Sequence, residues 1–204
     1  PRTDRIKSRR EELIGATRSV ASVFQFNLPD RSNIRYNRDL EPMGAIGDAG
    51  WYNMRAAVEY LPEGVELDGV SAFIRRDEET GAVIGASGAL QFTSGATSTF
   101  TCGFDSGVTV MDVLITGASG VISMDDFLFQ NADGSADFGL RTRGGSESVN
   151  VPSTKPGAAL MFEDMAAAAA DPGLRRRWMT VTERTQELLD AVWRVAVDNE
   201  DGAD

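Results

Sequence analysis

The chain has 204 residues, enough for one domain of ordinary size or two small ones. With 42% hydrophobic and 25% charged residues it has the composition of a folded globular protein, which excludes extensive disorder. Its 31 acidic residues outnumber 20 basic ones, and a net charge of -11 argues against nucleic acid as a partner, because a phosphate backbone would be repelled.

Two residue types limit the chemistry further. The chain has no histidine and one cysteine, Cys102, so it cannot form a Ser-His-Asp or Cys-His catalytic unit or a zinc site built from these residues. A lone cysteine forms no internal disulfide, which fits a reducing, cytoplasmic compartment. We expect Cys102 to be a small buried residue within a strand. No segment is apolar over the length of a membrane span or resembles a secretory signal, so we expect no membrane partner.

The first third of the sequence predicts a helix, a strand and a second helix. The charged opening lacks an initiator methionine and has the character of a cut inside a longer protein. A polar helix is expected over 4–15, within a connecting segment 1–17, and a long strand over 18–28. Residues 30–44 are expected to form a long loop, which in a compact domain is usually functional or mobile. Apolar residues at helical spacing predict the second helix over 51–61, ended by Pro62.

The middle of the chain is rich in strand signals. We expect hairpins at Ser94-Gly95 and at Asp105-Ser106-Gly107. Thr97, Thr99 and Thr101 alternate with apolar or small residues and would line one flat face, through which a homodimer could form. Strand after strand at hairpin spacing predicts one large, mostly antiparallel sheet. The expected strands cover 65–75, 82–92, 96–104, 108–116, 121–124, 127–130, 138–143 and 146–151.

The end of the chain is predicted to be helical. One helix is expected over 157–170 and another over 182–197, separated by a break at Asp171-Pro172-Gly173. The acidic tail from residue 198 or 199 to 204 is expected to fray. The chain is therefore predicted to be a single α+β domain with helices on one face of the sheet, in which 18–151 form a helix plus a sheet meander and 152–198 the C-terminal helices.

The most concentrated chemical feature is the turn into the second helix. Asp48 and Tyr52 are four residues apart, so on a helix they lie on one face, and a phenol beside a carboxylate can act as a general acid or base. Two simpler interpretations remain open. Asp48 could cap the helix N-terminus, and Tyr52 could be a half-buried aromatic.

Other candidates are weaker. The glycines at 44, 47 and 50 lack the dinucleotide-binding spacing and favour close approach of the backbone to a neighbour or ligand. Arg35 could clamp an anionic group or simply be solvated. The acidic pairs at 125–126 and 163–164 lack a third ligand, so no metal site is expected. Three arginines at 175–177 are too few to indicate nucleic-acid binding.

Several segments, in chain order, resemble the Gfo/Idh/MocA oxidoreductases. They are the opening PRT and its helix, NIR at 33–35, GAIGDAGWY at 44–52 and ITGASGVI at 115–122. The motif GAIGDAGWY, which ends in a tyrosine, is similar to that of the glucose-fructose oxidoreductase and dimeric dihydrodiol dehydrogenase branch. The resemblance implies the C-terminal domain of a two-domain enzyme whose Rossmann domain is absent from this chain.

The resemblance also implies an activity. The whole enzyme would transfer a hydride between NAD or NADP and a sugar-like or polyhydroxylated small molecule, with Asp48 and Tyr52 catalytic and Arg35 and Trp51 binding substrate. The cofactor would bind mainly through the absent domain, and homo-oligomers would form through the open sheet face. The family's E-K-P lysine is missing, and Lys155 has neither its context nor its place, so we expect the isolated chain to be inactive. The alternative is a non-catalytic binding or dimerisation module that retains the fold.

Overall fold

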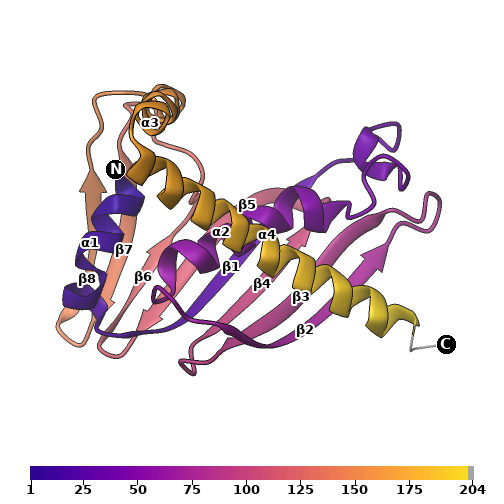
Figure 1. Cartoon of the computed structure of the whole chain (residues 1–204), viewed down its shortest axis with the longest axis horizontal. Helices are drawn as coiled ribbons and strands as arrows, with labels where there is room; N and C mark the ends of the chain where they lie inside the picture. The colour runs from indigo at the N-terminus through magenta and orange to yellow at the C-terminus, as the bar shows by residue number, and fades with distance from the viewer. Residues whose placement is uncertain (202–204) are drawn as a thin grey trace.

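The computed structural model describes residues 1–201, which form four α-helices around one face of a single sheet (Figure 1). The helices are α1 (Arg2–Ile14), α2 (Trp51–Tyr60), α3 (Gly157–Ala170) and α4 (Pro172–Asp201), with a 3-10 turn η1 (Ile34–Tyr36) and a π-helical turn η2 (Ile46–Gly50). The strands are β1 (Thr17–Asn27), β2 (Leu67–Arg76), β3 (Val83–Phe92), β4 (Thr97–Gly103), β5 (Asp105–Gly117), β6 (Gly120–Met124), β7 (Ala136–Thr142) and β8 (Gly145–Val151).

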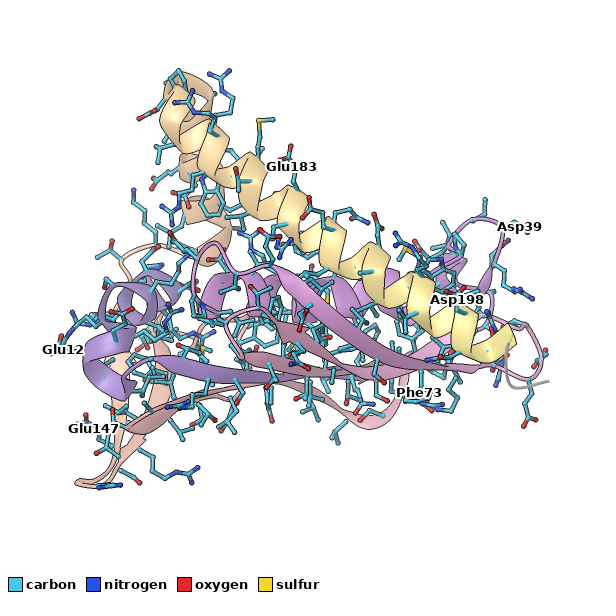
Figure 2. All side chains as sticks on the ribbon, turned by 60° about the horizontal axis from the view of Figure 1, so that its bottom comes forward. Glu12, Asp39, Phe73, Glu147, Glu183 and Asp198 are labelled. Carbon is cyan, nitrogen blue, oxygen red and sulfur yellow. The ribbon has the colours of Figure 1, made fainter. Side chains whose placement is uncertain are left out.

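The sheet has eight strands in the order β2-β3-β4-β1-β5-β6-β7-β8. All neighbouring pairs are antiparallel except β1 and β4, which run parallel. Helix α4 crosses one side of this sheet, and side chains project from both sides (Figure 2). The predicted α+β fold with a large, mostly antiparallel sheet is confirmed.

The predicted hairpin at residues 105–107 is wrong. Strand β1 lies between β4 and β5, so these two consecutive strands do not pair with each other. The chain turns at Phe104, whose carbonyl accepts the Leu28 N–H at 2.8 Å beyond the end of β1, and β5 begins at once at Asp105. Turn residues reveal a reversal of the chain, but they carry no signal for a distant strand that enters between the two arms.

The strand predicted over 127–130 is also wrong. These residues belong to the β6–β7 connection, which bends at Asp126 with a φ of 61°. The Asp126 carboxylate then accepts the Phe129 N–H at 3.0 Å. This local hydrogen bond holds the segment in a turn and competes with strand pairing.

Helix α4 is longer than predicted at both ends. It begins at Pro172 rather than 182, because proline is tolerated in the first turn and Asp171 Oδ1 accepts the Gly173 N–H at 2.7 Å as a cap. The expected frayed tail is helical to Asp201, and Glu200 makes an ion pair with Arg76 at 2.7 Å. The rest of the tail, 202–204, lies outside the described residues.

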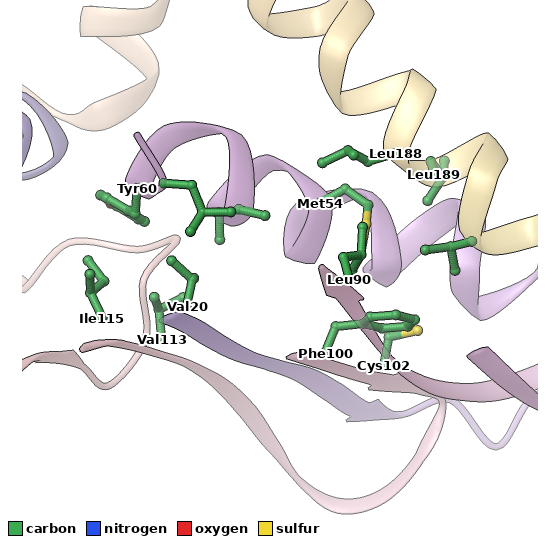
Figure 3. Close-up of a cluster of buried hydrophobic side chains, with 14 of the residues drawn as sticks. Val20, Met54, Tyr60, Leu90, Phe100, Cys102, Val113, Ile115, Leu188 and Leu189 are labelled. Atoms are coloured by element: carbon green, nitrogen blue, oxygen red, sulfur yellow. The ribbon is translucent and has the colours of Figure 1, made fainter. Parts of the chain in front are cut away.

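The core lies between the sheet and the helices. Helix α2 packs over β1 and against α4, while α1 packs on β6 and β7. Met54, Leu90 and Ile115 are among the fully buried side chains at this contact (Figure 3). On the other face, Thr97 and Thr99 are exposed while Ser98 and Phe100 are buried, so the predicted alternation is confirmed. No helix in the described part of the chain combines the length and apolarity that a membrane crossing requires.

Candidate active site

Asp48 lies in the π-helical turn η2, which continues into α2 without a break. The backbone at Gly50 and Trp51 is already helical, and the Asp48 side chain makes no capping hydrogen bond. The N-cap interpretation of Asp48 is therefore wrong. Single π-helical turns joined to α-helices frequently occur at functional sites.

The Asp48 carboxylate instead accepts a hydrogen bond from Arg35. Arg35 Nη2 donates to Asp48 Oδ1 at 2.7 Å, and the two side chains are 36% and 24% exposed. This hydrogen bond raises the pKa of Arg35 against the opposing effect of burial, with smaller contributions from Glu41 and Tyr52. The long loop thus delivers a guanidinium to the start of α2. The Nε of Arg35 is buried and has no hydrogen-bond acceptor among the described residues.

Tyr52 stands on the outer side of α2 and is 37% exposed. Its ring makes edge contacts with Phe24 of β1 and with Trp51, both at centroid distances of 5.4 Å. Within the described residues its hydroxyl has no hydrogen-bond partner, so it remains available to a ligand. Tyr52 does not point into the core, and it follows Asp48, the partner of Arg35, by four residues along the same helical segment.

The adjacent residue Asn53 fixes this helix to the sheet. It is fully buried, and its Nδ2 donates to Ser22 Oγ of β1 at 2.9 Å. The same strand carries Phe24, so the hydrogen bond sets the position of Tyr52 relative to its ring neighbour. A buried polar pair of this kind contributes to stability and also fixes register.

The site extends along α2 to residues that sequence reasoning did not find. The Arg55 guanidinium lies 5.8 Å from the Trp51 ring centroid and 5.5 Å from that of Trp178 in α4, and its Nε donates to Glu59 at 2.9 Å. Only the spacing of Trp51, Arg55 and Glu59 along one helix face was visible in the sequence. Trp178 is brought in by the tertiary fold.

The site lies on an open surface. Neither Asp48 nor Tyr52 lines the cavity beside α3, nor the two other cavities of several hundred cubic ångströms against α4. Both residues belong to elements on the helix-bearing side of the sheet, but they do not line a common cavity among these three. A second surface is needed to enclose a substrate there.

The glycine run serves packing against the sheet. Gly44 has a φ of 47°, and a Cβ there would lie 2.3 Å from the Val83 carbonyl oxygen. A Cβ at Gly50 would lie 3.4 Å from Cys102 Sγ. Cys102 is buried as expected, and burial raises the pKa of its thiol to about 12, so it is no nucleophile. Across residues 1–201 we find no group of three or more acidic or cysteine side chains arranged to hold a metal ion.

Comparison with known proteins identifies relatives of this chain. Residues 7–123 match the profile of the GFO/IDH/MocA C-terminal domain. The dTDP-3,4-didehydro-2,6-dideoxy-alpha-D-glucose 3-reductase of Actinomadura kijaniata is 27% identical over 182 residues, which are 89% of this chain and 53% of the relative. The chain thus spans about half the length of that reductase.

Solved structures show the same fold. A 3-ketoreductase from Actinomadura kijaniata, in complex with NADP and TDP-benzene, superposes with a TM-score of 0.80 at 25% identity, over 96% of this chain and 59% of that one. An aldose-aldose oxidoreductase from Caulobacter crescentus, complexed with glycerol, superposes with a TM-score of 0.78 at 18% identity, over 97% and 59%. The profile match covers more than half of the sequence, and the chain belongs to the GFO/IDH/MocA family as an example of its C-terminal domain.

Proposed function

We propose that this chain is the substrate-side domain of an NAD- or NADP-dependent oxidoreductase that acts on a sugar-like or polyhydroxylated small molecule. The observation that carries the proposal is the Tyr52 phenol, 37% exposed and without a hydrogen-bond partner among the described residues, four residues after Asp48 of the Arg35–Asp48 ion pair. Family membership supports it, as do the names of the relatives, which are a keto-sugar reductase, an NADP-bound ketoreductase and an aldose oxidoreductase.

In this proposal Tyr52 transfers the proton. Its hydroxyl donates to the carbonyl oxygen of a ketone substrate during reduction, or accepts the hydroxyl proton during oxidation. The Arg35 guanidinium, held by Asp48, supplies positive charge near the phenolic oxygen and stabilises negative charge that develops there.

The substrate is positioned by three further residues, Asp48, Arg35 and Trp51. Asp48 fixes the guanidinium through the 2.7 Å hydrogen bond, and the remaining N–H groups of Arg35 can bind a substrate hydroxyl. Trp51, perpendicular to the Tyr52 ring, offers an apolar wall for the flat face of a sugar ring.

The residues of this chain are better suited to binding the substrate than to binding the dinucleotide cofactor. The nicotinamide, when bound, supplies or receives the hydride. Gly44 and Gly47 face Val83 and Glu41 rather than an open cradle, so this glycine run holds no phosphate. We therefore place most of the cofactor-binding surface in a preceding Rossmann domain, and we expect the 204-residue chain to be inactive by itself.

The open sheet face supports self-association. Phe73 is 62% and Leu114 is 38% exposed among the small side chains of this face. An apolar surface of this kind, on a sheet that carries helices only on its other side, is typical of an interface between two copies. We propose a homodimer through this face.

The function is tested on the protein as purified from its source. Its intact mass is measured, and nicotinamide fluorescence is followed during titration with NADH and NADPH, with keto-sugar-dependent oxidation as the activity. A mass well above 22 kDa with saturable binding and turnover is the expected result. A native mass of 22 kDa without cofactor binding would leave a non-catalytic binding module and refute the proposal.

A further inference from the structure

Glu59, in the last turn of α2, is shared by two cations. Its Oε1 accepts from Arg55 Nε at 2.9 Å, and its Oε2 accepts from Lys7 Nζ at 2.7 Å. The Glu59 side chain is 11% exposed, so both oxygens are used in a largely buried place. One carboxylate cannot neutralise two cations, and the cluster therefore keeps a positive charge on a chain whose net charge is -11.

Arg177 of α4 brings a third cation to this place. Its guanidinium carbon lies 5.4 Å from the centroid of the Trp178 ring, and that of Arg55 lies 5.5 Å from the same centroid. Arg177 is exposed, and across residues 1–201 its guanidinium forms no ion pair or hydrogen bond. An anion beside Trp178 would therefore be attracted by two guanidinium groups at once.

The other charges beside the cluster already have partners. Lys7 and Arg177 line a cavity of about 460 Å³ between α2 and α4, as do Arg184 and Glu63. Arg184 is paired with glutamates at 3.0 and 3.8 Å, and Glu63 interacts with Arg10. Among the residues that line this cavity, no carboxylate remains to neutralise Arg177.

The cluster lies next to Tyr52. Arg55 follows Tyr52 by three residues in α2, which places the two side chains on neighbouring turns, about 4.5 Å apart along the helix axis. The Trp51 ring contacts both, at 5.4 Å from the Tyr52 ring and 5.8 Å from the Arg55 guanidinium. Arg55 Nη1 forms no hydrogen bond within the described part of the chain. A molecule that is bound at the Tyr52 hydroxyl and extends along α2 would therefore meet a guanidinium with free N–H groups.

We propose that Arg55 and Arg177 bind an anionic group of the substrate, a phosphate or a carboxylate, and make the enzyme selective for keto sugars that carry one. This inference rests on the proposed function and narrows its substrate class. Guanidinium groups bind both kinds of anion through paired N–H donors. Glu59 and the two indole rings already hold the Arg55 side chain in place, so little conformational freedom is lost when the anion binds.

A purely structural role for Arg55 predicts a different behaviour. If its side chain only joined α2 to α4 through Trp178, its replacement would destabilise the protein and affect all substrates alike. The charge of the substrate is therefore the variable that separates the two roles.

The test measures kcat/KM of the source protein for three matched substrates, which are a neutral keto sugar, its phosphate monoester and the corresponding keto uronate. The three are compared in the wild type, Arg177→Gln and Arg55→Lys. Arg177 is exposed, so its replacement should leave the fold intact, and Arg55→Lys keeps the charge but not the paired donors. Arg176→Gln removes the same charge from the neighbouring exposed position of α4 and is the matched control.

We expect the wild type to prefer an anionic substrate over the neutral one by about tenfold or more, as a charge-assisted hydrogen bond would provide. Arg177→Gln and Arg55→Lys should each lower this preference by about threefold or more, mainly through KM, and Arg176→Gln should leave it within about 1.5-fold. The anion that is preferred, phosphate or carboxylate, identifies the group that the site binds.

Equal kcat/KM for all three substrates, or a preference for the neutral one, would overturn the anion site and leave the proposed function standing. A preference that persists in both variants, or that falls equally in Arg176→Gln, would also overturn it. Absence of turnover with every substrate would refute the proposed function, and this inference with it.

Discussion

Gly44 illustrates how single residues position the site. Its φ of 47° and its approach to the Val83 carbonyl bring the π-helical turn against β3, and the turn carries Asp48 toward Arg35. No other residue type fits this place without strain, because a side chain would collide with backbone and not with a flexible group. The glycine is thus required for packing.

Replacing Gly44 with alanine tests this role. The left-handed conformation costs about 1–2 kcal/mol and the collision about 1–3 kcal/mol more, so the free energy of unfolding should fall by about 2–5 kcal/mol. Gly64→Ala is the matched control, since Gly64 has a φ of 73° with nothing within 4 Å of the added atom and should show only the conformational part. Urea unfolding measures both variants, and equal losses would contradict the assigned contact.

At the scale of single residues, the sequence indicated which residues belong to the candidate site better than it indicated which residues they contact. The spacing of Asp48 and Tyr52 predicts that both lie on one helix face, and the structure has Asp48 in η2 and Tyr52 in the helix α2 that continues from it. Arg35 was considered as a clamp for an anion, but its partner is the Asp48 carboxylate of the same chain. The contact of Arg55 with Trp178 joins residues far apart in the sequence, and no local pattern encodes such a pair.

Among the elements, the loop before η2 is held to the sheet by Asp77, which follows β2 and is 5% exposed. It accepts from Arg31 Nη2 at 2.8 Å, and its Oδ1 accepts the Thr80 N–H at 2.9 Å. The Arg31 hydrogen bond, opposed by burial and aided by Thr80, holds the pKa of the Asp77 carboxyl well below its usual range. The loop that carries Arg35 is thereby anchored.

This shift predicts a loss of stability in acid. A carboxyl with a lowered pKa in the folded state contributes stability above the pKa of the unfolded chain, about 3.9, and loses it as the pH falls toward the folded value. The urea midpoint should therefore decline below about pH 4. Asp77→Asn should lower the midpoint at pH 7 and flatten this decline. If the wild type and Asp77→Asn had the same urea midpoint at every pH, the assignment of this loss of stability to Asp77 would be contradicted.

Elements were predictable where their signals are local. Alternation located the long strands, and Pro62 correctly placed the end of α2, which the structure has at Tyr60. The insertion of β1 between β4 and β5 was not predictable, because strand order depends on contacts distant in sequence. The early start of α4 was encoded by Asp171 and Pro172, but proline was taken for a breaker where it begins a helix.

The whole molecule has two unlike faces, one covered by helices and one bare sheet. If the bare face joins two copies, Phe73→Glu should convert the protein from dimer to monomer in sedimentation velocity, because a charge would be buried against its own symmetry mate. Leu40→Glu, on the loop and 64% exposed against 62% for Phe73, is the matched control and should leave the dimer intact. A dimer that survives Phe73→Glu would refute this interface.

The most direct test of the central claim is the turnover of Tyr52→Phe in the source protein. Loss of the proton donor should lower kcat by about 100-fold or more, with cofactor affinity unchanged. Tyr36→Phe removes a hydroxyl that donates to the Leu28 carbonyl at 2.7 Å, so it should cost about 1 kcal/mol of stability and leave kcat within about twofold. If Tyr52→Phe turned over as fast as Tyr36→Phe, Tyr52 would have no part in proton transfer and the assignment of the site would be wrong.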